Sequence, residues 1–329
     1  TCCVNNGGFD NFVRDIQVDS NGKILVGGDF TLYSGASANN IIRLNTNGTK
    51  DTSFLYGTGF SSGGVYVICV QKDGKIVVGG QFTQYSGVSA NNIVRLNSGG
   101  TIDSSFSYGS GFVGNVFDIK QQYDGKLIVA GEMTSYSGGS IGRIVRLNSD
   151  GTKDSSYVTG SGFDNTVYKI ALQNDDKVVA VGGFGTYSGV SANRIIRLTT
   201  GGTKDSTFSY GGGFSGTTQN VKIQPNGKIV VFGGGLFYSG QPIQYVTRLN
   251  TDGIRDSTFP GTSGFTFSSG SFTALELQDD GKIIFGGTFT GYSGNSVTNI
   301  VRVTSGGTKD NSFTVSPGGN GQIVVIKQK

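Results

Sequence analysis

The sequence predicts an all-β protein built from repeated hairpins, and three observations lead to this prediction. Glycine supplies 57 of the 329 residues, far above the average usage of about 7%, so tight turns must be frequent. The chain contains 22 Phe and 14 Tyr but only 15% charged residues, a composition that argues against disorder. A pattern of about 51 residues recurs six times, and periods of this length are typical of propellers and solenoids.

The composition excludes several classes of function. Histidine is absent, which removes every triad, zinc site and acid–base pair that needs an imidazole. The formal net charge of +4 is too small for the Lys and Arg excess of a nucleic-acid binder. No run approaches the roughly 18 apolar residues of a membrane span. We therefore expect no metal site, no cofactor, no specific nucleic-acid partner and no membrane span.

Neither the cysteines nor the first residue points to a compartment. Cys2, Cys3 and Cys69 form no disulfide framework, because an odd number leaves at least one thiol free. The chain begins at Thr1 without a methionine or an apolar signal region, as expected of a mature or excised product. Redox chemistry therefore favours no particular compartment.

Three charged positions mark each repeat. A lysine follows a turn dipeptide, an arginine comes 20 residues after the lysine, and an aspartate comes 8 residues after the arginine. Successive lysines are 52, 51, 51, 51 and 54 residues apart. The variation falls between an aspartate and the next lysine, so the segment from lysine to aspartate is rigid and the connection tolerates insertion. The three sets are Lys23, Lys75, Lys126, Lys177, Lys228 and Lys282; Arg43, Arg95, Arg146, Arg197, Arg248 and Arg302; and Asp51, Asp103, Asp154, Asp205, Asp256 and Asp310.

Each repeat is expected to open with an antiparallel hairpin. The first strand alternates apolar and polar residues, as in residues 13–18. An Asn-Gly or Asp-Gly dipeptide follows, such as Asn21-Gly22, and predicts a two-residue type I′ turn. The fourth repeat has Asp175-Asp176 instead, so its turn should be strained or of another type. The second strand, residues 24–28, is continuously apolar, which indicates burial on both faces by two neighbouring sheets.

A second hairpin completes the repeat. It consists of a loop with the motif Tyr-Ser-Gly, a third strand such as 41–44, a turn such as Asn47-Gly48, and a fourth strand that ends at an aromatic such as Phe54. Two hairpins per repeat, buried on both faces and arranged radially, describe a propeller blade. We therefore predict one domain over residues 1–329, a six-bladed β-propeller of four-stranded antiparallel blades.

The end of the sequence contains one further strand signal. Residues 322–327 fall where a seventh first strand would begin, and an extra C-terminal strand is predicted there. It would add to an edge of the ring or belong to a longer protein from which the chain was cut. A seven-bladed ring and an open arc are the alternatives to six blades.

The repeats resemble a known family. The relevant phrases are Asp-Gly-Lys-Ile-Val-Val-Gly-Gly-Gln-Phe-Thr at 73–83, Asn-Asn-Ile-Val-Arg-Leu-Asn at 91–97 and Asp-Ser-Ser-Phe at 103–106. They resemble the delta-60 β-propeller repeat, and the resemblance recurs six times over nearly the whole chain. The Gly-Gly strand ends are also similar to kelch repeats, although the kelch tryptophan is missing. The resemblance implies a propeller without common catalytic residues, found in bacterial surface proteins and phage virions, and hence an extracellular, cell-surface or virion location.

The arginines and aspartates suggest ion pairs within the scaffold. A two-residue turn at 47–48 would direct Arg43 and Asp51 to opposite faces of their blade. Our hypothesis is that each arginine binds the aspartate of an adjacent blade. A three-residue bulged turn would instead place both residues on one face of the same blade.

The repeated lysines should share one face of the propeller, because both hairpin turns lie at the same end of each blade. One interpretation is solvated charge on exposed edges. The other is a weakly basic rim for an acidic polymer such as an anionic glycan, whose binding would depend steeply on salt.

The candidate binding residues lie in the loops at the opposite face. Tyrosine beside Ser, Asn and Gly suits contact with sugar or protein, because rigid rings adjoin adaptable polar groups. The alternative is that an aromatic present in every repeat packs between blades. These residues are Tyr33, Tyr85, Tyr136, Tyr187, Tyr238 and Tyr292.

The predicted function is recognition without catalysis. Only two glutamates occur, Glu132 and Glu276, and no phosphate loop or calcium loop is present, so we name no catalytic residue. We predict a non-enzymatic recognition or structural module of a bacterial surface or phage virion protein, serving adhesion or receptor binding to a protein or glycan. The alternative is a propeller-type glycan lyase or hydrolase, which needs acids in the central channel. The inward positions Arg14, Asp15, Asp118 and Lys169 do not repeat as a catalytic set. No oligomeric state is predicted.

Overall fold

The computed structural model describes residues 8–233, 235, 237–243, 245–259, 264–266, 272–314, 323 and 325–328. The elements in these residues are all β-strands. None of the described residues belongs to a helix that could cross a membrane. The chain divides into two compact units, Thr1–Gly162 and Phe163–Gln328, and each unit contains three repeats.

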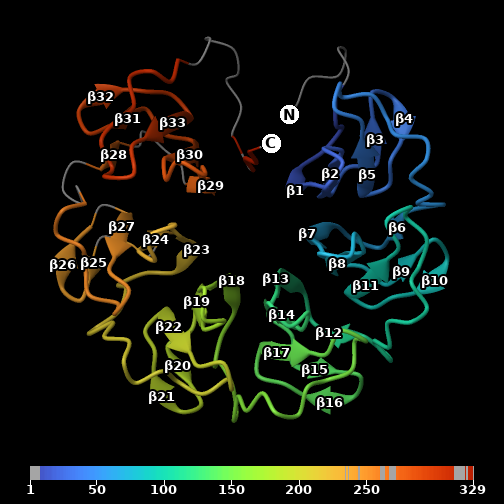
Figure 1. The fold of residues 1–329 in the computed structure, drawn as a ribbon, viewed down its shortest axis with the longest axis horizontal. Coiled ribbons are helices and arrows are strands. Elements are labelled where there is room, and N and C mark those ends of the chain that lie inside the picture. Colours follow the sequence, from blue (N-terminus) through green and yellow to red (C-terminus); the bar gives the residue numbers. More distant parts are fainter. Residues whose placement is uncertain are drawn as a thin grey trace. The chain divides into compact units, whose positions relative to one another are not determined.

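Each repeat of the first unit contains one main sheet (Figure 1). The sheet is antiparallel, and the second strand lies in the middle with the first strand on one side and the third on the other. The strands are β1 (Val13–Val18), β2 (Ile24–Gly28) and β5 (Ile41–Leu44) in repeat one, β7 (Val65–Val70), β8 (Ile76–Gly80) and β11 (Ile93–Leu96) in repeat two, and β13 (Val116–Gln121), β14 (Leu127–Gly131) and β17 (Ile144–Leu147) in repeat three.

The second unit repeats this arrangement. Its first strands again form one edge of the sheets, which we call the inner edge in both units (Figure 1). The strands are β18 (Val167–Leu172), β19 (Val178–Gly182) and β22 (Ile195–Leu198) in repeat four, β23 (Thr218–Ile223), β24 (Ile229–Gly233) and β27 (Val246–Leu249) in repeat five, and β29 (Phe272–Leu277), β30 (Ile283–Gly287) and β33 (Ile300–Val303) in repeat six.

Short outer strands pair at the other edge of each unit. In the described residues the Tyr-Ser-Gly loops form two-residue hairpins, and in several repeats a strand from the preceding connection joins them. The outer strands are β3 (Leu32–Tyr33), β4 (Ala36–Ser37), β6 (Phe60–Ser61), β9 (Gln84–Tyr85), β10 (Val88–Ser89), β12 (Phe112–Val113), β15 (Ser135–Tyr136), β16 (Gly139–Ser140), β20 (Thr186–Tyr187), β21 (Val190–Ser191), β25 (Phe237–Tyr238), β26 (Gln241–Pro242), β28 (Phe265–Thr266), β31 (Gly291–Tyr292) and β32 (Asn295–Ser296).

The hairpin turns differ from the predicted type, and the turn at Asn21-Gly22, where Asp19 N donates to Lys23 O and Gly22 N to Asp19 O, has the same form as the turn after β5. Asn45 N donates to Thr49 O at 2.8 Å and Gly48 N donates to Asn45 O at 2.9 Å, so three residues form the loop. Only the glycine has a positive φ, +83°. This is a type I turn followed by a left-handed glycine bulge, and the type I′ prediction is wrong here. The two-residue turn with two positive φ values occurs instead in the outer hairpin, at Ser34 (φ +50°) and Gly35 (φ +79°).

The turn in repeat four has the same hydrogen bonds. Gln173 N donates to Lys177 O and Asp176 N donates to Gln173 O, both at 2.9 Å. Asp176 occupies the position of the glycine with φ +60°. A side chain in the left-handed region is costly, so the predicted strain is present, although the turn type is unchanged.

The predicted fourth strand is reduced to one bridge, Leu44↔Lys50 in repeat one. The cause is the side chain of Asp51, which accepts hydrogen bonds from the backbone N (3.0 Å) and hydroxyl (2.7 Å) of Ser53. Such a local turn competes with a ladder and directs the chain out of the sheet. The described blades are therefore three-stranded, and the four-stranded prediction is not supported. The six-bladed ring and the single domain over residues 1–329 stay predictions.

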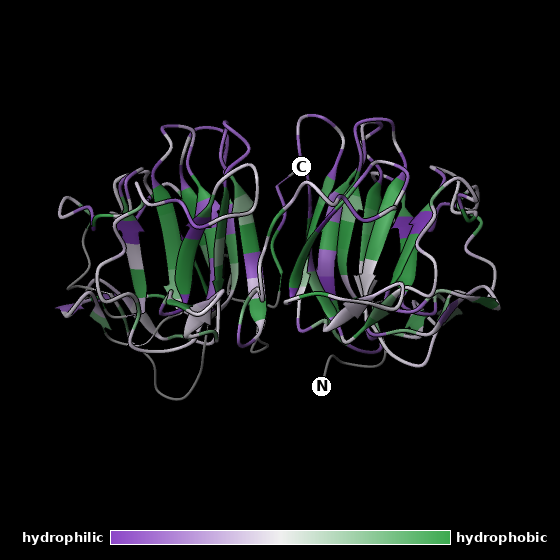
Figure 2. Ribbon diagram, turned by 90° about the horizontal axis from the view of Figure 1, so that it is seen from below, coloured by the Kyte–Doolittle hydropathy of each residue, from purple (hydrophilic) through white to green (hydrophobic). Residues whose placement is uncertain are grey.

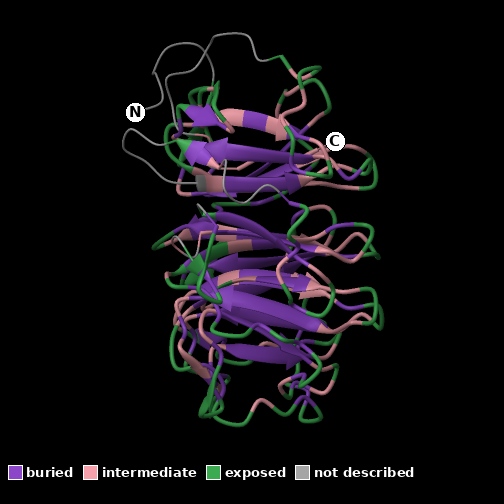
Figure 3. Cartoon of the chain, turned by 90° about the vertical axis from the view of Figure 1, so that its left-hand side faces the viewer, coloured by how far each residue is buried: buried purple, intermediate pink, exposed green. Residues whose placement is uncertain are grey.

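Apolar cores lie between consecutive main sheets within each unit. Figure 2 shows the main strands in green, hydrophobic, and Figure 3 shows them largely buried. The glycine doublets that end the second strands allow this close packing. A Cβ on Gly27 would lie 2.4 Å from Cγ1 of Val65 on the next sheet, so a side chain there would displace that sheet.

The predicted C-terminal strand, 322–327, is partly outside the described residues, which omit 322 and 324. Ile323 and Ile326 pack against Gly286 of β30. The described residues of this segment form no β-bridge, and the extra strand stays a prediction.

Candidate functional site

The repeated charges form one cluster per repeat. In repeat one, Oδ2 of Asp51 accepts from Arg43 Nε at 2.7 Å and from Lys23 Nζ at 2.7 Å. The same three positions pair in every repeat, with Arg Nε–Asp Oδ2 distances of 2.7 or 2.8 Å. Burial acts to raise the pKa of Asp51, but hydrogen bonds from Lys23, Ser53 and Arg43 outweigh it and hold this pKa well below its usual value.

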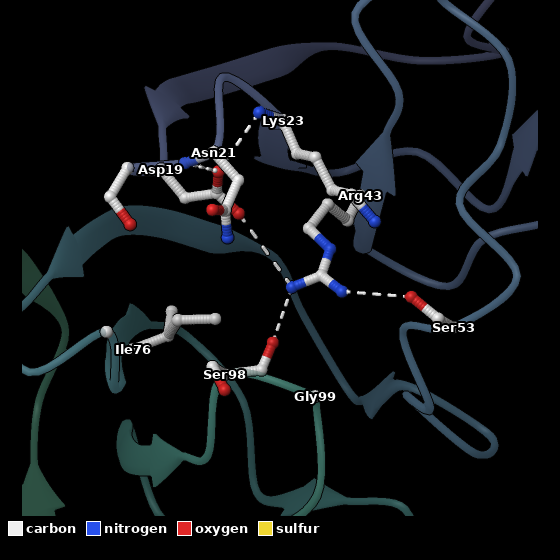
Figure 4. Close-up of a pocket in the computed structure, with 10 residues that line it drawn as sticks. Asp19, Asn21, Lys23, Arg43, Ser53, Ile76, Ser98 and Gly99 are labelled. Carbon is white, nitrogen blue, oxygen red and sulfur yellow. Dashed lines mark hydrogen bonds and ion pairs between the residues drawn. The ribbon is translucent and has the colours of Figure 1, made fainter.

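The hypothesis that each arginine binds the aspartate of an adjacent blade is wrong. The three-residue turn puts Arg43 and Asp51 on the same face of one repeat, which was the alternative. The arginine still connects neighbouring repeats through another group. Its Nη1 donates to the carbonyl of Ser98 in the second turn of repeat two, as Figure 4 shows. Arg95, Arg197 and Arg248 make the same contact to Ser149, Thr251 and Ser305.

A cavity of about 220 Å³ lies beside this contact, between repeats one and two (Figure 4). A matching cavity of about 470 Å³ lies between repeats four and five. The charged groups that line the first cavity already bind one another, since Arg43 lies 3.9 Å from Asp19 as well as binding Asp51. We therefore interpret the charge clusters as scaffold.

The six predicted tyrosines occupy equivalent positions in the outer hairpins. Tyr85 is 1% exposed, its hydroxyl donates to Gly100 O at 2.6 Å, and its ring centroid lies 4.6 Å from that of Phe60. Burial raises the pKa of Tyr85. Each of the other five hydroxyls also donates to a turn glycine. This geometry is that of the packing alternative, and the binding role stays a prediction.

The first strand of every main sheet contains a β-bulge. In repeat one, Val13 pairs with Gly28 and Asp15 pairs with Gly27, so Arg14 is the extra residue. Bulges redirect side chains and are frequent beside functional sites. The bulge is common to all repeats, but the residue on it varies, with tyrosine in two of the six. These residues are Arg14, Tyr66, Phe117, Tyr168, Gln219 and Thr273.

In the first unit the bulge residues lie side by side along the inner edge. The guanidinium carbon of Arg14 lies 4.6 Å from the ring centroid of Tyr66, a cation–π distance. The rings of Tyr66 and Phe117 are 5.7 Å apart and inclined by 15°, so they stack. Arg14 is exposed and both rings are half-buried. Three sheets therefore contribute one continuous, solvent-facing column.

Polar side chains adjoin this column from the residue that follows the second strand of each sheet, after Gly28, Gly80 and Gly131. Asp29 accepts a bidentate pair from Arg14, at 2.7 and 2.5 Å. Tyr66 Oη donates to Gln81 Oε1 at 2.8 Å. Glu132 accepts from Asn115 Nδ2 at 2.5 Å.

Burial and the neighbouring charges shift the pKa values of Arg14 and Tyr66. The hydrogen bond to Asp29 raises the pKa of Arg14. Burial raises the pKa of Tyr66; Arg14 opposes this effect, while Asp29 and Glu132 reinforce it.

We call the six residues of the column and its polar neighbours the bulge row: Arg14, Tyr66, Phe117, Asp29, Gln81 and Glu132. In the sequence of the second unit the matching positions are Gly183, Gly234 and Thr288, none of which is a carboxylate or an amide. Among the residues that the structure describes, no three His, Cys, Asp or Glu gather as metal ligands.

Sequence reasoning placed only Arg14 of this row at the inner edge. The missed signal is the variable position between the two apolar residues of each first strand, as in Val65-Tyr66-Val67-Ile68. The other predicted inward residues have separate roles. Asp15 Oδ2 accepts from the backbone N of Ile68 at 2.7 Å, and buried Asp118 binds Lys120 at 2.6 Å. Lys169 lies on β18 in the second unit.

Antiparallel sheets that repeat with buried glycine doublets define a β-propeller repeat protein. The sequence belongs to the family described as "Domain of unknown function (DUF5122) beta-propeller", which it matches at residues 20–54, 71–106, 122–157, 173–208, 224–259 and 278–313. This match supports a propeller repeat family, but it does not confirm the delta-60 name. No curated protein matches the sequence.

Solved structures with a similar fold include a catalytically inactive virginiamycin B lyase from Staphylococcus aureus, at 14% identity and TM-score 0.49, over 91% of this chain and 85% of that one. A gluconolactonase from Xanthomonas campestris matches at 13% identity and TM-score 0.40, over 68% and 69%. The propeller of Dos1 matches at 10% identity and TM-score 0.48, over 88% and 71%. These likenesses extend to the fold alone.

The comparisons correct one prediction. The sequence predicts that the chain is not an enzyme, but solved structures with a similar fold include a lyase and a gluconolactonase. These folds contradict that prediction, because the fold does not exclude an enzyme, and they do not make this chain one.

Proposed function

We propose that the chain is a recognition module that binds a neutral glycan at the bulge row. The observation that supports this proposal most strongly is the column of Arg14, Tyr66 and Phe117 on three successive bulges. Residues common to all repeats are buried or paired within the scaffold. The bulge residues are held by a common backbone feature, differ between repeats and face solvent in the first unit.

The chemistry of the row fits sugar hydroxyls. Carboxylate and amide groups of Asp29, Gln81 and Glu132 offer several acceptors and one amide donor for neighbouring hydroxyls. The half-buried rings of Tyr66 and Phe117 adjoin them, and ring edges carry partial positive charge, which suits sugar oxygens. One arginine with two carboxylates gives the row a formal charge of −1, which disfavours an anionic glycan. A glycan partner is consistent with a surface or virion location, which we also propose.

The variant Phe117→Ala tests this proposal. The control is Gln219→Ala, which removes the side chain of an exposed bulge residue in the second unit. Wild-type protein should bind a subset of neutral glycans on an array. Phe117→Ala should weaken that binding about tenfold, since losing one central contact costs on the order of 1.4 kcal/mol. Gln219→Ala should bind like the wild type.

Absence of neutral-glycan binding by folded wild-type protein, or equal loss in both variants, would contradict the proposal. Release of reducing ends in the same mixtures would instead favour the lyase or hydrolase alternative.

A further inference from the structure

The C-terminal segment lies on the sixth main sheet as a first strand lies on the sheet before it. A Cβ on Gly286 would lie 2.7 Å from Cγ2 of Ile323 and 3.0 Å from Cδ1 of Ile326. A Cβ on Gly27 would lie 2.4 Å from Val65 and 3.0 Å from Ile68. The two isoleucines therefore occupy the positions of the two apolar residues in a first strand.

Two polar contacts fix the segment in this position. The hydroxyl of Thr273, the bulge residue of β29, donates to the carbonyl of Ile323. Oε1 of Glu276 lies 3.2 Å from Lys327 Nζ, and its Oε2 lies 2.8 Å from Lys222 Nζ. Glu276 is 5% exposed, and a carboxylate this buried is costly without cationic partners.

The described part of the segment lacks the hydrogen-bonded ladder of a true first strand. β7 forms five residue pairs with β8, whereas residues 323 and 325–328 form no β-bridge. Among the described residues, the contacts that hold the segment include side-chain packing on Gly286 and the polar contacts of Thr273 and Glu276. The same segment of a second copy of the chain could make each of these contacts.

We propose that Gly286, Thr273 and Glu276 form a strand seat, a binding site for an extended peptide with apolar residues at positions i and i+3 and lysine at i+4. In this proposal, residues 323–328 of a second copy compete with the chain's own segment for the seat. The outcome is exchange of C-terminal segments between copies, the usual form of domain swapping.

Two complementary variants of the full chain test the proposal. Ile323→Asp/Ile326→Asp removes the apolar ligand and leaves the seat intact. Gly286→Val blocks the seat, because the valine side chain would collide with Ile323. This variant leaves the segment itself intact. Each variant alone should stay monomeric in native mass spectrometry, and an equimolar mixture should form a one-to-one dimer. A mixture that stays monomeric, although both variants give cooperative melting, would overturn the proposal.

A peptide measurement covers the case in which one variant folds poorly. A labelled peptide with the sequence of residues 320–329 should bind Ile323→Asp/Ile326→Asp saturably and bind Gly286→Val at least tenfold more weakly. Replacement of the lysine equivalent to Lys327 by Glu in the peptide should weaken binding about tenfold, because the charge faces Glu276. Equal binding to both variants, or indifference to the lysine, would contradict the strand seat. Peptide binding without dimer formation would overturn the exchange between copies.

Discussion

At the scale of single residues, each repeated aspartate pairs with one arginine and one lysine side chain and also accepts hydrogen bonds that stabilise a local turn. Asp103 accepts from Arg95 Nε at 2.7 Å and from Lys75 Nζ at 2.9 Å, and its other oxygen accepts from Ser105. Spacing in the sequence predicted that arginine and aspartate pair. It did not predict the correct partner, because the pairing depends on a turn one residue longer than the dipeptide suggested.

The first prediction concerns removal of this carboxylate. Asp103→Asn leaves Arg95 and Lys75 without a countercharge in a site where Arg95 is 5% exposed. We expect the free energy of unfolding at pH 7 to fall by about 3 kcal/mol, as measured by urea denaturation. Arg95→Met, which leaves the aspartate bound to Lys75, should cost less. Wild-type stability in Asp103→Asn would contradict the scaffold role.

The lowered pKa of Asp103 leads to a prediction for how the free energy of unfolding depends on pH. Burial acts to raise the pKa of Asp103, but hydrogen bonds from Ser105, Lys75 and Arg95 lower it overall. A lowered folded-state pKa contributes stability above the ordinary carboxyl pKa of about 3.9, and this stability is lost as the pH falls further. Wild type should therefore lose stability below about pH 4, and Asp103→Asn should show a shallower loss over this range. Parallel curves for the two proteins would contradict the assignment.

At the scale of elements, the first three strands of each repeat follow from pattern. Alternation predicts β1 and continuous apolar residues predict β2, since these patterns report burial. The prediction of a fourth strand failed because the Asp-x-Ser turn at Asp51 competes with pairing of this segment to the third strand. The bulges were not predicted from the sequence for another reason. A bulge adds one residue without changing the composition of a strand, so the bulged residue is found only from the pairing register.

The turn of repeat four gives a prediction for one element. Asp176 has φ +60° where the other first turns have glycine, so Asp176→Gly should relieve backbone strain and raise the free energy of unfolding by about 1 kcal/mol. Asp175→Gly is the matched control, because Asp175 lies outside the left-handed region and its carboxylate accepts from Lys177 N at 3.2 Å. This control should lower stability. A fall in stability for Asp176→Gly in thermal melting would show that no strain is present.

At the scale of the whole molecule, repetition separates two kinds of residue. Positions shared by all repeats, such as Tyr85 and Arg95, are buried and satisfy groups of the scaffold. The bulge residues vary, and in the first unit the residue after each second strand adds a carboxylate or amide side chain beside them. Sequence predicted the six repeats and the family class, because both depend on periodicity. It could not predict the bulge row, whose members are 15 to 118 residues apart and meet only through sheet stacking.

The most direct test compares two isosteric changes with binding and stability measured on each. Glu132→Gln keeps the shape of the bulge row and removes one charge, so glycan affinity should fall about tenfold, with the loss of a charged hydrogen bond, and the melting temperature should stay unchanged. Tyr85→Phe removes the buried hydrogen bond to Gly100, so stability should fall by about 1–2 kcal/mol with affinity unchanged. The reverse pattern, with binding lost in Tyr85→Phe and kept in Glu132→Gln, would contradict the separation of scaffold from recognition.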